Sequence, residues 1–210
     1  MNDPTRPRRS SRRNPCTGGR RRTARQAIQI GGAILAILLV AGALRPQETP
    51  TVEYQVKAAF LYNFAKFIEW PPEAFPNEKS PITFCVHGSD PFGNALDEAI
   101  RGKSVDNREF RARRTTEYPE LKSCQLVFVS EKEDKHLGEI LSSVKGVSVL
   151  LVGESAEFAE RGGTVQFFLE NNKLRFAVNV DAAKRARLQI SSKLLALARI
   201  VSDTGHAKGN

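Results

Sequence analysis

Cysteine and histidine, the residues most often used for redox chemistry and metal binding, are few in this sequence. Of the three cysteines, Cys16 lies in an arginine-rich N-terminal stretch, which leaves Cys85 and Cys124 in the body of the chain. Neither has a C-x-x-C partner, which argues against a thiol oxidoreductase. In an oxidising compartment the pair is more often bridged than free, and the alternative is two buried thiols. The residues alone leave both states open.

The histidines do not mark a catalytic or metal site. His87, His136 and His206 lack metal-ligand spacing to a cysteine or a carboxylate. The sequence contains neither the G-x-S-x-G motif of a nucleophilic serine nor a phosphate-binding P-loop. We therefore expect a protein that is not an enzyme and that uses no metal and no cofactor.

Polar residues follow three apolar segments, at the points where buried strands would end. In a parallel sheet, ligands bind outside the carboxyl ends of the strands, and the N-termini of the following helices attract anions there. The sequence thus allows a small polar ligand at this edge, although ordinary helix capping is the simpler explanation of the same residues. The residues that would bind it are Ser89, Asp90, Ser130 and Ser155.

The elements that would position these residues alternate between apolar strands and helices. Uniformly apolar strands between helices are typical of a sheet that is covered on both faces and is largely parallel. We expect a single-domain α/β sandwich with a mostly parallel central sheet, helices on both faces, and a C-terminal hairpin followed by a helix. The predicted strands are 82–86, 126–129 and 147–152, the helices 92–101, 132–144 and 182–201, and the hairpin strands 164–169 and 174–180, which meet at Asn171-Asn172.

The first helix is predicted to begin after Thr51 and to end before Pro71-Pro72, which cannot continue it. Its apolar residues form two stripes, so it should pack against two partners, for example the sheet and another helix or subunit. Asn63 falls within one stripe. It is either a hydrogen-bonded amide of the core or a contact to a ligand or partner.

The segment Arg108–Arg114 is predicted to be an exposed basic strand. Alternation places Arg111 and Arg113 on one face, together with Glu109. A charged strand is usually a solvated edge that discourages aggregation. The other interpretation is that these arginines contact a partner.

Most of the net charge of +9 lies at the N-terminus, where residues 1–43 hold nine arginines and one acid, Asp3. The body of the chain is nearly neutral, so we do not expect nucleic-acid binding. The apolar run behind the arginines, with Ala41-Gly42-Ala43, is typical of a signal peptide that could be cleaved after Ala43. Retention as a membrane anchor is the alternative. The predicted organisation is a cytoplasmic arginine-rich region (1–26), a signal-peptide core or anchor (27–44), a linker (45–52), an exported domain (53–201) and a polar tail (202–210).

Three segments resemble the YfiR family of periplasmic regulators. The first is EYQVKAAFLYNFAKFIEWP (Glu53–Pro71). The second is the turn Gly102-Lys103-Ser104-Val105 before the basic strand, and the third is FAVNVDAAKRARLQISSKLLALARIV (Phe176–Val201). The resemblance covers about residues 53–201, the whole predicted exported domain.

This resemblance implies a periplasmic α/β domain that forms a homodimer. It also implies a role in restraining an inner-membrane signalling protein, a diguanylate cyclase, and so in lowering cyclic-di-GMP and biofilm formation. The resemblance also implies that members of the family have cysteines at the positions of Cys85 and Cys124, which favours a disulfide between them. Arg187 stands where the family commonly has a glycine that interrupts the last helix, so we expect a continuous helix there and an altered dimer or partner surface.

Two functions from different classes therefore remain. The favoured one is a non-catalytic regulator that contacts its membrane partner or its dimer mate through residues such as Asn63, Arg111, Arg113 and Arg187. The alternative is a periplasmic module that binds a small ligand at the carboxyl ends of the strands.

Overall fold

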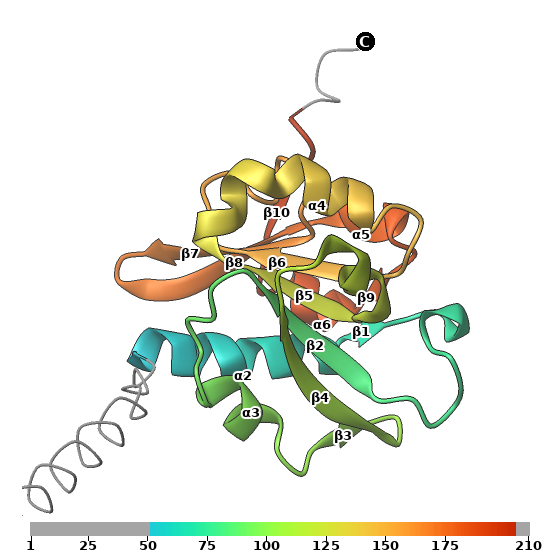
Figure 1. Cartoon of the computed structure of the whole chain (residues 1–210). Helices are drawn as coiled ribbons and strands as arrows, with labels where there is room; N and C mark the ends of the chain where they lie inside the picture. Colours follow the sequence, from blue (N-terminus) through green and yellow to red (C-terminus); the bar gives the residue numbers. More distant parts are fainter. Residues whose placement is uncertain (1–50, 205–210) are drawn as a thin grey trace, which may run out of the picture. The chain divides into compact units, whose positions relative to one another are not determined.

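The computed structural model describes residues 51–204 (Figure 1). The predicted leader and most of the tail lie outside the described residues. The helices are α2 (Val52–Lys66), α3 (Ala95–Ile100), α4 (Leu137–Ser143), α5 (Val180–Arg185) and α6 (Ser192–Leu195), with the 3-10 turns η1 (Pro72–Ala74), η2 (Tyr118–Ser123) and η3 (Glu131–His136). The strands are β1 (Ile68–Glu69), β2 (Ile82–His87), β3 (Ser104–Val105), β4 (Arg108–Thr115), β5 (Leu126–Val129), β6 (Leu150–Gly153), β7 (Val165–Glu170), β8 (Lys173–Asn179), β9 (Gln189–Ile190) and β10 (Arg199–Val201).

Eight of these strands form one sheet, in the order β10-β8-β7-β6-β5-β2-β4-β3. All neighbouring pairs are parallel except β7–β8 and β3–β4. β1 and β9 form a separate antiparallel pair. The predicted fold class, a mostly parallel α/β sheet in a single domain, is confirmed.

Both faces of the sheet are buried, each under its own core (Figure 1). One face packs against α2 and α3, where Leu61 and Phe64 meet Phe84 and other side chains of the sheet. The other face packs against α4 and η2, and its core includes Ile140 and Cys85. Because alternate residues of a strand point to opposite faces, the central strands β2, β5 and β6 are buried at every position, which explains their mostly apolar sequences.

The predicted hairpin is present as β7 and β8. Its turn residues Asn171 and Asn172 have φ of 52° and 57°, the left-handed region that asparagine tolerates.

The prediction of one continuous helix over 182–201 is wrong. α5 ends at Arg185, and Arg187 adopts a φ of 55°. The backbone N–H of Leu188 donates to the carbonyl of Ala183, and that of Arg187 to Lys184, which together form a Schellman C-cap. The helix is interrupted here because Leu188 is buried in the core beside Ala183. In a continuing helix the side chain of Leu188 would point away from Ala183 and from the core.

α2 begins after Thr51 and ends at Lys66, before Pro71-Pro72, as predicted. One of its two apolar stripes is largely exposed, with Val52 74% and Val56 41% exposed, so a second packing partner for this helix stays a prediction. Asn63 is exposed as well, so its interpretation as a core amide is wrong. A contact with a partner stays a prediction for this residue.

Candidate functional site

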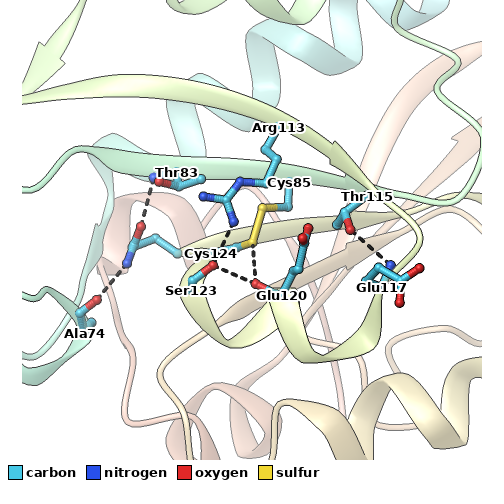
Figure 2. Close-up of a disulfide and its surroundings, with 10 residues drawn as sticks. Ala74, Thr83, Cys85, Arg113, Thr115, Glu117, Glu120, Ser123 and Cys124 are labelled. Carbon is cyan, nitrogen blue, oxygen red and sulfur yellow. Dashed lines mark hydrogen bonds between the residues drawn. A yellow bond between two sulfur atoms is a disulfide. The ribbon is translucent and has the colours of Figure 1, made fainter.

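A disulfide joins Cys85 of β2 to Cys124, which lies between η2 and β5 (Figure 2). The two Cα atoms are 6.0 Å apart, within the usual range for a bridge. The bridge favoured by the family resemblance is therefore present. Cys85 and Cys124 are only 0% and 1% exposed. Because a thiolate must reach a sulfur atom to reduce it, this burial shields the bridge from reductants in the folded protein.

Arg113 is tied to the segment that carries this bridge (Figure 2). Its Nη1 donates to Oγ of Ser123 at 2.9 Å, and that hydroxyl donates to the carbonyl of Glu120 at 2.7 Å. Arg111, on the same face of β4, is exposed. Of the two predicted contact arginines, Arg111 therefore presents its side chain to solvent, whereas Arg113 is committed to holding η2.

The four predicted contact residues do not lie in one patch. Asn63 is on α2, which covers one face of the sheet, whereas Arg113 faces η2 on the other. Arg187 follows α5, and its Nη2 donates to the carbonyl of Gly146 at 3.2 Å. Any single partner surface would therefore include only part of this set.

The carboxyl ends of β2, β5 and β6 lie side by side, as the ligand prediction requires. Ser89 is exposed, and Asp90 accepts from the backbone N–H of Phe92 and pairs with Arg114 at 2.9 Å. Ser130 and Ser155 are buried, and neither hydroxyl has a hydrogen-bond partner in the described part of the chain. Ser130 therefore does not cap the turn that follows it, and the ligand role of the four residues stays a prediction.

Side chains of the protein itself fill much of this edge. Tyr54 donates to Oε1 of Glu154 at 3.0 Å, and Lys57 pairs with the other oxygen, Oε2. Lys57 also pairs with Glu53 one turn earlier. Burial and then the negative charge of Glu154 raise the pKa of the Tyr54 hydroxyl, so it stays a proton donor. This network joins the start of α2 to the end of β6.

Sequence reasoning missed this network, although it contained a signal. Lys57 lies three residues after Tyr54 and four before Leu61, on the stripe of α2 that is buried. A lysine at a buried position of a helix requires a carboxylate partner elsewhere in the chain. The sequence could not show that Glu154 would supply it.

Backbone geometry also closes the edge beside β2. Gly88 has a φ of 86°, and a Cβ at this position would lie 2.5 Å from Cγ of Glu133 and 2.7 Å from Oγ of Ser130. Only glycine fits so close to η3.

His87, the last residue of β2, is a second feature that sequence reasoning did not select. It is 1% exposed, and neither ring nitrogen has a hydrogen-bond partner with good geometry among residues 51–204. Its ring lies 5.2 Å from that of Tyr118. Burial lowers the pKa of His87, and the nearby carboxylate of Glu133 opposes this effect only in part. The imidazole is therefore neutral at neutral pH.

The described residues contain no group of three or more His, Cys, Asp and Glu side chains placed to hold a metal ion. No helix between residues 51 and 204 combines the length and apolar character needed to cross a bilayer. The segment predicted to be a signal-peptide core or anchor lies outside this range.

Two solved structures share a limited likeness with the chain. One is a conserved domain protein from Vibrio cholerae O1 biovar El Tor, with 10% identity and a TM-score of 0.47, over 70% of this chain and 60% of that one. The other is the ABC domain in complex with L-Trp from Streptococcus pneumoniae, with 11% identity and a TM-score of 0.41, over 62% and 59%. The chain thus spans about 60% of the length of each.

A family model described as YfiR/HmsC-like matches residues 54–199. The match begins in α2 and ends at the first residue of β10, so it includes the other seven strands of the eight-stranded sheet in full. The chain belongs to the YfiR/HmsC-like family.

Proposed function

We propose that this protein is a non-catalytic periplasmic regulator that binds an inner-membrane signalling protein and restrains it. The partner would be a diguanylate cyclase, so that binding lowers cyclic-di-GMP and biofilm formation. Membership of the YfiR/HmsC-like family, over residues 54–199, is the observation that carries this proposal.

The mechanism is a shift in occupancy. When the domain is bound, the partner's periplasmic region is held in its inactive conformation, and release lets the active conformation predominate. A conformational change can follow only if the domain binds the two states with different affinities. Because the disulfide is buried, direct reduction of Cys85 and Cys124 is a poor signal for release of the partner. Envelope stress, or competition from another protein for the same surface, is a better one.

The exposed stripe of α2 is the surface we propose for this contact. Val52 and Val56 are apolar and are exposed by 74% and 41%, one helical turn apart. Exposed apolar side chains grouped on one helix face are typical of protein interaction sites. Homodimerisation, which the family resemblance implies, stays a separate prediction that sedimentation velocity can measure.

Crosslinking in living cells tests the proposal. A photo-reactive amino acid at Val56 should capture an inner-membrane protein with a diguanylate cyclase domain, identified by mass spectrometry. The same group at Leu169, which is 60% exposed on the β7–β8 hairpin, is the control. Deletion of the gene should raise cyclic-di-GMP. Absence of any cyclase among the captured proteins, together with unchanged cyclic-di-GMP, would exclude this function.

A further inference from the structure

A cavity of about 740 Å³ lies between α4 and α5, away from the strand ends discussed above. Its floor is formed by Val144, Val149 and Leu151, which are buried in the second core. Leu141 and Val147, which pack against the same core, are half-buried and also line the cavity. Cavities of this size, lined by apolar side chains and a few polar groups, are typical of sites for small molecules.

The space exists because the α5 side of the cavity carries small residues. Ala182 and Ala186 line it opposite Leu141 of α4. Longer side chains at the two alanine positions would extend the core across the gap. The half-buried side chains of Leu141 and Val147 therefore stay partly exposed, and a bound apolar group would cover them.

The arginines around the cavity are neutralised by the protein itself. Arg161 donates to both carboxylate oxygens of Asp134 at 2.8 Å. Arg185 pairs with Asp203. Lys145 is exposed, so water screens its charge. An anionic ligand would have to displace these contacts.

Glu160 differs from the other charged residues of the lining. Its Oε2 is buried and accepts no hydrogen bond from any residue in the described range. Its backbone carbonyl is occupied, because it accepts from the N–H of Thr204 at 3.0 Å. A buried carboxylate oxygen without a donor is unfavourable, and a turn of this half-buried side chain toward a donor in the cavity would relieve it.

We propose that this cavity binds a small apolar molecule carrying a protonated amine, whose ammonium pairs with the carboxylate of Glu160 while its apolar part packs on Leu141 and Val147. The carboxylate recognises the amine by a charge-assisted hydrogen bond, and the half-buried apolar side chains of the lining recognise the apolar body. This site is independent of the regulator function and of the α2 surface.

A fluorescence titration of the protein purified from the cell envelope tests the site. The probe is dansylcadaverine, which joins an apolar fluorophore to a primary amine. Its emission should increase and shift to shorter wavelength, with saturation at one probe per chain. Dansylamide, which lacks the amine, and dansylglycine, which carries a carboxylate, should bind at least about tenfold more weakly, the loss typical of one charge-assisted hydrogen bond.

Variants locate the binding. Glu160→Gln should weaken dansylcadaverine at least about tenfold and leave dansylamide unchanged, since it removes only the charge. Glu157→Gln, an exposed glutamate of the same loop that does not line the cavity, is the matched control. Ala186→Leu should fill the cavity and weaken every probe. Thermal unfolding of each variant checks that it is folded. If Glu160→Gln does not fold, Glu160→Asp takes its place, because its shorter side chain moves the carboxylate away from the ligand.

Three results would overturn the proposal. They are an unsaturated titration of the wild-type protein, equal affinity of wild type and Glu160→Gln for dansylcadaverine, and unchanged binding in Ala186→Leu. Equal affinity for dansylglycine would assign the cavity to apolar molecules without the amine and would refute the role of Glu160.

Discussion

Lys57 on α2 and Glu154 directly after β6 form an ion pair across 97 residues of sequence. The two side chains are only 4% and 10% exposed. Tyr54 occupies the second oxygen of the same carboxylate. The contact holds the first turns of α2 against the carboxyl edge of the sheet.

Removing the cation of this pair should destabilise the domain. In Lys57→Met the carboxylate of Glu154 stays buried without its counter-charge, and such an unpaired charge costs about 3–5 kcal/mol. We expect the free energy of unfolding in urea to fall by about 3 kcal/mol, toward the lower end of that range because Tyr54 still donates to Glu154.

An exposed ion pair of the same type provides the control. Lys184 pairs with Asp181 at 3.6 Å, with side chains 73% and 54% exposed. Lys184→Met should change the free energy of unfolding by less than about 0.5 kcal/mol. If the two substitutions changed the free energy of unfolding equally, the buried Lys57 pair would not be what holds α2 against the sheet.

Loss of the disulfide should also destabilise the domain. The bridge closes a loop of 39 residues, for which the chain-entropy model gives about 4 kcal/mol. The double variant Cys85→Ala, Cys124→Ala should lose about 3–4 kcal/mol in urea unfolding. Cys16→Ser, which leaves the bridge intact, should match the wild type.

The same bridge should resist reduction in the folded protein. Because both sulfur atoms are buried, dithiothreitol should reduce the bond only as fast as the domain unfolds. Thiol labelling over a series of urea concentrations measures this rate. Rapid reduction without urea, with the fold retained, would instead support a redox sensor.

Acidification should weaken the domain through His87. Burial lowers the pKa of this imidazole below its ordinary value of about 6.5, so the unfolded chain takes up the proton first as the pH falls. The neutral imidazole thus contributes its full stability above pH of about 6.5, and this contribution declines below it. The midpoint of thermal unfolding should fall between pH about 7 and about 5.

A substitution separates this contribution from those of other groups. His87→Phe keeps a ring beside Tyr118 but cannot take up a proton, so the decline with falling pH should be smaller. His136→Gln, at a half-buried histidine on η3 whose ring contacts Glu133, should retain most of the decline, because the charge of His136 makes only a minor contribution to the lowered pKa of His87. A wild-type slope in His87→Phe would place the acid sensitivity elsewhere.

The elements that were predicted well are those whose local sequence pattern matches the burial and backbone conformation of the same residues in the folded domain. β2 and β5 are buried at every position and mostly apolar because both faces of the sheet are covered, and Asn171-Asn172 supplies the φ values of the hairpin turn. The pair Cys85 and Cys124 could be selected because no other cysteine lies in the domain.

The features that were missed depend on contacts between distant segments. The partner of Lys57 is known only once α2 lies across the end of β6. His87 is buried by η2 and η3, which follow it in the sequence. A cavity such as that beside Glu160 arises where small side chains of one helix meet another, and no spacing within a single segment reveals it.

The C-terminal segment shows how a correct apolar period can predict the wrong element. Ile190, Leu194 and Leu197 have helical spacing, yet Ile190 pairs with Ile68 in a strand and Leu197 is 72% exposed. Ser191 begins a new short helix, α6, by accepting from the backbone N–H of Lys193. The break before it depends on Arg187 in a conformation that the side chain disfavours.

Glycine at position 187 should therefore stabilise the domain. A left-handed conformation costs a non-glycine residue about 1–2 kcal/mol, and Arg187→Gly removes this strain. Two effects oppose the gain: the exposed hydrogen bond to Gly146 is lost, and glycine raises the conformational entropy of the unfolded chain. We expect a net gain of about 0.5 kcal/mol in urea unfolding. Lys184→Gly, inside α5, should lose about 1 kcal/mol and serves as the matched control.

Arg187→Val should be less stable than the wild type, because a β-branched residue strongly disfavours positive φ. A stabilised Arg187→Val would contradict the left-handed C-cap that separates α5 from β9.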